Sequence, residues 1–157
     1  MVYAPGQLLF IAGLPGSGKS HWLRTHAPPE RFFIVDDFMA HAYHDIGRFA
    51  HSRWYFPLVF ALRAGRDSAI SDIAFCDEQR RAEAERVMAD AVHQLSYRWI
   101  YFENAPSACR HNIELDIRKV GRAGTKRLEA LETWRQEYTI PEGAEVVPVV
   151  RGDEESG

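Results

Sequence analysis

The stretch G-L-P-G-S-G-K-S, residues 13–20, matches the phosphate-binding pattern G-x-x-x-x-G-K-[S/T] at every fixed position. It follows an apolar run at 8–12 that is typical of a buried strand, and it precedes a segment with helical character at 21–26. Its glycines let the backbone turn tightly and direct successive N–H groups at an anion, and the N-terminus of the next helix adds partial positive charge there. The stretch therefore predicts a strand, a loop and a helix that bind a nucleoside triphosphate.

Two side chains of this loop have distinct expected contacts. Lys19 would reach the outer phosphates, and the Ser20 hydroxyl would sit on a magnesium ion. The residues expected to bind ATP here are Gly13, Leu14, Pro15, Gly16, Ser17, Gly18, Lys19, Ser20 and His21.

The composition limits the class of protein. A length of 157 residues predicts a single domain, 1–157, and 46% hydrophobic residues are enough for a sizeable core. The net charge of −3 gives no global electrostatic case for a nucleic-acid partner, although a locally basic groove stays open. Two cysteines are too few for a disulfide framework or a metal cluster. With no basic leader and no apolar run longer than nine residues (54–62), we expect a cytoplasmic protein without a membrane partner.

Strand-like and helical segments alternate along the chain, which predicts an α/β fold with a parallel sheet covered by helices on both faces. We expect strands at 7–12, 31–35, 68–75, 97–102 and 145–150. We expect helices at 18–26, 46–64, 77–95, 106–121 and 125–138. Pro148 favours an edge position for the last strand, since proline cannot donate to a ladder, and the tail at 151–157 is expected to be frayed.

Carboxylates follow the second and third predicted strands, at the sheet edge where α/β proteins bind ligands. Asp36 and Asp37 end the second strand, and Asp72 lies near the end of the third with Asp77 after it. Asp36 is well placed to orient or deprotonate an acceptor hydroxyl, and Asp72 to hold magnesium. A helix cap for the aspartate pair and a turn residue for Asp72 are the alternatives.

Basic residues crowd the segment that we expect to form a lid, about 106–127, which Gly121 and Gly124 interrupt. This composition suits a mobile flap that closes over phosphates, and a solvated, charged helix end is the alternative. The basic residues are Arg110, Arg118, Lys119, Arg122, Lys126 and Arg127.

Two other nucleotide-binding classes fit less well. A GTPase would need a guanine-reading N-K-x-D after a strand, and the chain has none. Residues 73–78, I-A-F-C-D-E, resemble the acidic strand end of a ring-forming AAA+ ATPase, but no residues are left for the further helical domain of such modules.

The stretches G-L-P-G-S-G-K-S-H-W, I-V-D-D-F and A-I-S-D-I-A-F, with Arg80 and Arg81 shortly after, resemble the polynucleotide-kinase-like P-loop kinases. This AAA_33-type group is related to zeta toxins and chloramphenicol phosphotransferases. The resemblance extends to residues 108–112, A-C-R-H-N, and to G-T-K at 124–126, and so covers essentially the whole chain. It implies a three-layer P-loop fold with strand order 2-3-1-4-5, and ATP and Mg²⁺ as ligands.

The resemblance also implies roles for single residues. Asp36 matches the acid that activates the acceptor hydroxyl, and Asp72 matches the acid after the third strand. Arg122 matches the lid arginine that stabilises charge on the transferred phosphate, with Arg110 and Arg118 as alternatives that would also bind ATP. His111 stands where the pattern has an arginine.

The acceptor site is expected in the aromatic- and histidine-rich segment 38–66, between the second and third strands. The candidates for acceptor binding are Asp37, Arg53 and Arg81. A zinc site made by His41, His44, Asp45 and His51 is conceivable, although its spacing matches no familiar pattern.

Together these patterns predict a magnesium- and ATP-dependent kinase that transfers the γ-phosphoryl group to a hydroxyl. Lys19, Asp36 and Arg122 would be catalytic, and Ser20 and Asp72 would hold the metal. The expected acceptor is a nucleoside, a nucleotide or a nucleic acid, including 5′-hydroxyl ends or a modified base in DNA. A small alcohol or antibiotic is the alternative acceptor, and a switch module that binds ATP without kinase activity is the alternative function.

Overall fold

The central strand, β1 (Leu8–Ala12), is buried at all five positions, as expected where both faces of a parallel sheet are covered. The computed structural model describes residues 4–36, 49–120 and 125–152. In it β1 pairs in parallel with β3 (Asp67–Ser71) on one side and with β4 (Tyr97–Phe102) on the other. Adding β2 (Phe32–Val35) and β5 (Val146–Val147) gives the order β2-β3-β1-β4-β5, which confirms the predicted topology.

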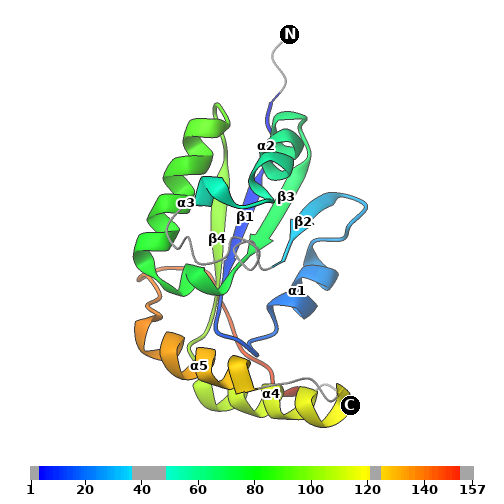
Figure 1. Ribbon diagram of the computed structural model, residues 1–157. Coiled ribbons are helices and arrows are strands. Elements are labelled where there is room, and N and C mark those ends of the chain that lie inside the picture. Colours follow the sequence, from blue (N-terminus) through cyan, green and yellow to red (C-terminus); the bar gives the residue numbers. More distant parts are fainter. Residues whose placement is uncertain (1–3, 37–48, 121–124, 153–157) are drawn as a thin grey trace.

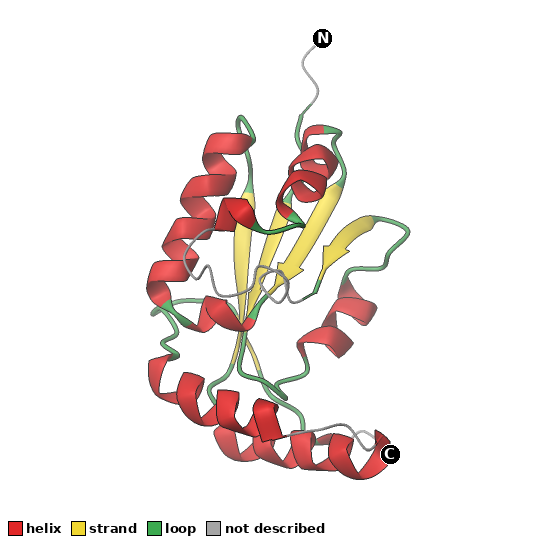
Figure 2. Ribbon diagram, viewed as in Figure 1, coloured by secondary structure: helices red, strands yellow, loops and turns green. Residues whose placement is uncertain are grey.

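Five α-helices and two short 3-10 helices surround this sheet in the described part of the chain (Figures 1 and 2). Figure 1 shows α4 and α5 together at the end of the sheet where the 13–20 loop lies. The α-helices are α1 (Lys19–His26), α2 (Tyr55–Arg63), α3 (Glu78–Ala91), α4 (Pro106–Val120) and α5 (Thr125–Glu137). The 3-10 helices are η2 (Phe49–His51) and η3 (Ile73–Cys76). None of the described helices is long and apolar enough to cross a membrane.

The structure differs from the predicted elements in three places. β3 ends at Ser71 rather than at 75, because a carboxylate oxygen of Asp72 accepts from Ala74 N at 2.7 Å and starts η3. In the predicted helix 46–64, the described part is split into η2 and α2. β5 covers only two residues at the sheet edge and ends just before Pro148, which has no N–H to continue the ladder.

Aromatic side chains fill the interior between the sheet and the segment that includes η3. The Phe10 ring is fully buried, stacks on Trp99 at 4.3 Å between centroids and meets the edge of Phe75 at 5.7 Å. The Trp99 indole N–H donates to Glu85 of α3 at 2.5 Å, so the polar atom of this partly buried ring is hydrogen-bonded. This cluster holds α3 and η3 against the central strands.

Tyr138, in the C-terminal half of the chain, hydrogen-bonds the sheet at the point where the 13–20 loop begins. In α5, Leu131 is fully buried and Leu128 packs against the core. Tyr138, just after α5, is buried, and its hydroxyl donates to the carbonyl of Phe102 and lies 3.3 Å from that of Ala12. These carbonyls belong to the last residues of β4 and β1, so Tyr138 joins both strand ends.

We expect Tyr138→Phe to lower the free energy of unfolding by about 1–2 kcal/mol, because it removes a buried hydrogen bond and leaves a buried carbonyl without its donor. Urea denaturation of the wild type and the variant measures this difference. Tyr97→Phe is the matched control, since Tyr97 is 40% exposed, and it should change the value by less than about 0.5 kcal/mol. Equal effects of the two substitutions would contradict the stabilising role of the Tyr138 hydroxyl at the ends of β1 and β4.

Candidate active site

The loop of residues 13–20, called the P-loop below, leaves β1 and enters α1 through two glycines in the left-handed region. Gly16 has φ +80° and Gly18 has φ +98°, a conformation that residues with a side chain rarely adopt. Gly18 is the N-cap of α1, and no side chain caps this helix end in the described structure. The N–H groups of the first turn of α1 therefore suit an anion.

The loop also lies too close to its surroundings for side chains. A Cβ on Gly13 would come within 2.7 Å of the Ser17 hydroxyl, and a Cβ on Gly16 within 2.5 Å of the Cys109 carbonyl in α4. The donor set and this close packing fit a phosphate-binding cradle made of main-chain atoms.

The Lys19 side chain folds back over the loop. Its ammonium donates to the Gly13 carbonyl at 2.7 Å and to the Leu14 carbonyl at 2.9 Å. The cation thus lies beside the main chain of the P-loop, where a short movement of a long side chain would bring it to a phosphate.

Asp36 connects three parts of the site. Its carboxylate accepts from the Ser20 hydroxyl of α1 and from the Ser71 hydroxyl at the end of β3, each at 2.5 Å. The strand register explains the second contact, because Val35 pairs with Ile70 and the next residues are Asp36 and Ser71. Sequence reasoning did not include Ser71, although this register of the predicted sheet could have found it.

Asp72 occupies a different environment. It is 1% exposed, it caps η3, and it does not line the cleft formed by the described residues. The turn role that the sequence left as an alternative is therefore present, and binding of magnesium by Asp72 stays a prediction.

A cleft of about 840 Å³ opens in front of the P-loop, between α1, α4, α5 and the segment after β5. On α4 the lining residues are Asn112, Leu115, Asp116 and Lys119, a spacing that marks one helix face. The charged side chains that line the cleft are Lys19, Arg24, Asp36, Asp116, Lys119, Lys126 and Arg127. Cations outnumber acids in this set, so the cleft favours an anionic ligand.

Of the candidates for the lid arginine, the two described ones, Arg110 and Arg118, do not line the cleft. Arg110 pairs with Glu132 of α5, and neither it nor Arg118 lies on the α4 face that carries the lining residues. Arg122 lies outside the described residues. The described cations of the expected lid segment that line the cleft are Lys119, Lys126 and Arg127, and Arg127 pairs with Asp116 at 3.0 Å. The basic composition of the segment indicated cations near the P-loop, whereas only the helical phase could show which of those on α4 line the cleft. A lid that closes over phosphates stays a prediction.

Two of the residues expected to bind the acceptor, Arg53 and Arg81, lie in the described part of the chain, and neither lines the cleft. Arg81 is 5% exposed, donates to the Phe75 carbonyl at 2.8 Å and to the Thr139 hydroxyl at 3.3 Å, and lies over the Tyr101 ring. It is therefore an interior residue and is not part of the cleft lining. Arg53 stacks on Trp54, also away from this lining.

Several of the residues that the sequence singled out lie outside the described part of the chain. Asp37 lies outside the described residues, as do three members of the conceivable zinc site, His41, His44 and Asp45. No cluster of metal-ligating side chains was found among the residues that the structure describes.

Both cysteines lie against the P-loop. The Cys76 thiol donates to the Gly13 carbonyl at 3.4 Å, and the Cys109 main chain packs on Gly16. Both thiols are free and fully buried. Burial raises the pKa of Cys76 to about 12 and that of Cys109 to about 11.

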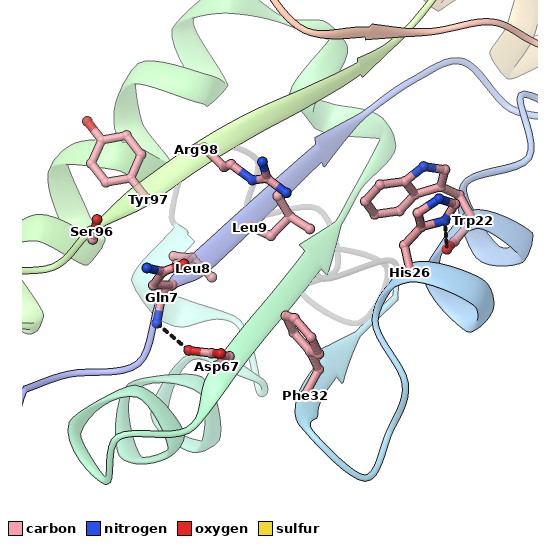
Figure 3. Close-up of a pocket in the computed structure, with 10 residues that line it drawn as sticks. All are labelled: Gln7, Leu8, Leu9, Trp22, His26, Phe32, Asp67, Ser96, Tyr97 and Arg98. Carbon is pink, nitrogen blue, oxygen red and sulfur yellow. Dashed lines mark hydrogen bonds between the residues drawn. The ribbon is translucent and has the colours of Figure 1, made fainter.

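A second, smaller cavity of about 380 Å³ lies where strands β1, β3 and β4 begin, and so at the other end of the sheet (Figure 3). Trp22 and His26 of α1 form one wall with stacked rings 4.4 Å apart. Asp67 lies on another side and accepts from the main-chain N–H of Gln7 at 2.8 Å. None of the residues predicted for catalysis or binding lines this cavity.

Comparisons with known proteins agree with this arrangement. A family model described as AAA domain, AAA_33, matches residues 8–141. An uncharacterized protein of Acanthamoeba polyphaga mimivirus, R277, is 30% identical over 136 residues, which are 85% of this chain and 87% of the viral protein.

Solved structures share the fold at low sequence identity. Kti12 from Chaetomium thermophilum, in complex with ADP-AlF3, has a TM-score of 0.59 and 17% identity, with 90% of this chain and 88% of that chain covered. A gluconokinase from Sinorhizobium meliloti 1021 has a TM-score of 0.57 and 16% identity, with 97% and 87% covered. A chain of the Pnkp1/Rnl/Hen1 RNA repair complex has a TM-score of 0.53 and 17% identity, with 90% and 50% covered.

We expect Arg81→Met to lower the free energy of unfolding by about 2–3 kcal/mol, because hydrogen bonds from a buried charged donor are lost. Arg86→Met, at an exposed position of the same helix, is the control and should change it by less than about 0.5 kcal/mol. Chemical denaturation measures both. If Arg81→Met leaves stability unchanged, the interior role of Arg81 is wrong.

The free energy of unfolding should fall as the pH rises above about 9. The folded-state pKa of both thiols is raised above the usual 9.0, so between pH 9 and about 11–12 the unfolded chain has lost protons that the folded chain retains. The contribution of the two thiols to the free energy of unfolding is therefore complete below pH 9 and is lost as the pH rises above it. Denaturation curves from pH 7 to 11 test this, and a Cys76→Ala/Cys109→Ala variant should show a shallower decline. An identical decline in both proteins would assign the effect to other groups.

Proposed function

This chain belongs to the AAA_33 family of P-loop proteins, and we propose that it is an ATP- and Mg²⁺-dependent phosphotransferase that acts on an acceptor hydroxyl. The family match confirms the resemblance that the sequence motifs indicated. One observation carries the proposal. The Ser20 hydroxyl donates a hydrogen bond of 2.5 Å to the Asp36 carboxylate, and both side chains line a cation-rich cleft beside the P-loop.

The phosphate side of the reaction rests on main-chain donors and cations. The P-loop N–H groups and the N-terminus of α1 would hold the phosphates of ATP, and Lys19 would pair with the outer ones. The lid residues Lys119, Lys126 and Arg127 line the same cleft and would offset charge that develops on the transferred group. Arg122 stays a further proposed member of this lid set.

Magnesium would be held by the Ser20 hydroxyl and the Asp36 carboxylate, because hard oxygen ligands suit this ion. When bound, the ion neutralises charge on the phosphates. Asp72 is proposed to support it from the end of β3.

Asp36 is also our candidate for the acceptor side. It follows the end of β2, faces the cleft, and presents a carboxylate that could orient the acceptor hydroxyl and take its proton. The hydrogen bonds from Ser20 and Ser71 fix the direction of this carboxylate, which a positioned base requires.

The acceptor class that the charge distribution favours carries a phosphate of its own. Arg24, in the last turn of α1, adds a further cation to the lining of the same cleft. A nucleotide or a nucleic-acid end would use this excess charge, whereas a neutral small alcohol would not. The proposed acceptor stays the hydroxyl of a nucleoside, a nucleotide or a nucleic acid, and the charge of the cleft favours the nucleotide and the nucleic acid within this class. Small alcohols are the alternative that the experiment includes.

A transfer screen with ATP labelled at the γ-phosphate tests this function. The panel contains nucleosides, nucleotides, oligonucleotides with free 5′-hydroxyls, DNA with modified bases, and small alcohols. We expect acceptor-dependent transfer that Lys19→Ala lowers at least about 100-fold, while Arg86→Ala, at the exposed α3 position, leaves it unchanged. Hydrolysis of ATP that no acceptor stimulates would instead support a switch module.

Asp36→Asn separates the two proposed tasks of this carboxylate. Loss of transfer by about 100-fold or more with unchanged affinity for Mg²⁺-ATP indicates the acceptor role, as expected for a missing general base. Loss of transfer together with weaker Mg²⁺-ATP binding indicates the metal role. Calorimetric titration and initial rates measure both quantities, and wild-type transfer rates in Asp36→Asn would contradict either role.

A further inference from the structure

One asparagine of α4 joins three segments that are far apart in the sequence. The Asn112 amide donates to the Gly16 carbonyl of the P-loop at 3.0 Å and to the Val150 carbonyl at 3.0 Å. Its side-chain oxygen accepts from the Gly152 N–H at 2.7 Å. The side chain thus makes both donor contacts of its NH₂ group and one acceptor contact, which is nearly its full capacity.

The contact with the P-loop fixes the plane of a peptide group. The Gly16 carbonyl belongs to the same peptide group as the Ser17 N–H, and this N–H donates to the Leu14 carbonyl at 3.1 Å. Because a peptide group is planar, holding both of its ends sets its orientation. Gly16 itself packs against the Cys109 carbonyl, one turn before Asn112 on α4, so this helix supports the loop at two adjacent points.

The other two contacts of Asn112 hold the segment after β5. Val150 and Gly152 line the cleft, and a Cβ on Gly152 would come within 3.2 Å of the Leu115 side chain. Glu103 holds the start of this segment, since its carboxylate accepts from the Val149 N–H at 2.8 Å. Glu103 therefore hydrogen-bonds the segment alone, whereas Asn112 hydrogen-bonds both the segment and the P-loop.

We infer that Asn112 is a positioning residue for nucleotide binding. It fixes the Gly16–Ser17 peptide, and with it the turn of the P-loop whose other N–H groups would meet the phosphates. With the same amide it holds the segment after β5, which lines the cleft. Nucleotide affinity then depends on a side chain that acts through the loop main chain. The inference rests on the nucleotide binding of the proposed function, and it does not depend on phosphoryl transfer or on the acceptor.

The test compares Asn112→Ala and Asn112→Leu with Glu103→Ala in the full-length chain. Leucine keeps the approximate shape of asparagine without its hydrogen bonds or any new charge, and alanine serves if leucine prevents folding. Glu103→Ala is the matched control because it loosens the same segment and leaves the loop contact intact. Circular dichroism and urea denaturation report folding and stability, and titration with Mg²⁺-ADP reports affinity.

We expect both Asn112 variants to bind Mg²⁺-ADP about 10- to 100-fold more weakly, and Glu103→Ala to stay within about 3-fold of the wild type at a comparable loss of stability. If folded Asn112 variants bind like the wild type, or if Glu103→Ala weakens binding equally, the inference is overturned. A wild type that binds the nucleotide without transferring phosphate overturns the proposed phosphotransferase and leaves this inference standing, whereas a wild type that binds no nucleotide overturns both.

Discussion

The rest of the structure depends on the close approach of the P-loop main chain to α4. The loop has to turn sharply after a fully buried strand, and at Gly16 it meets the Cys109 carbonyl at a distance that excludes a side chain. Main-chain donors can converge on an anion only where the backbone turns in this way. The glycines therefore serve two purposes, because they permit the left-handed conformation and they permit the contact.

Hydrogen bonds from distant segments support this turn from several sides. Tyr138 reaches the ends of β1 and β4 below the loop, Cys76 contacts Gly13, and Asn112 contacts Gly16. Each donor lies in a different segment of the chain, so the geometry of the loop is a property of the whole domain. This arrangement agrees with the general finding that functional groups require support from a surrounding shell of packed and hydrogen-bonded residues.

The sequence predicted the parts of the molecule that follow from local pattern. Apolar runs located all five strands, and the family resemblance implied their order, which the structure confirms. The sequence did not predict contacts that depend on strand register or helical phase. Examples are the hydrogen bond from Ser71 to Asp36 and the finding that Lys119, rather than Arg118, lines the cleft from α4. The sequence also assigned Arg81 to the acceptor, because an arginine after an acidic strand end gives no sign that its guanidinium will turn inward to the Phe75 carbonyl.

The contact between Gly16 and α4 restricts the choice of amino acid at one of its two positions and not at the other. Position 109 contributes a carbonyl oxygen, which every amino acid possesses, so the contact itself does not specify the residue there. Position 16 has to lack a side chain, so the contact specifies glycine alone. Related chains with the same backbone arrangement are thus free to exchange the cysteine for another small buried residue while the glycine stays fixed.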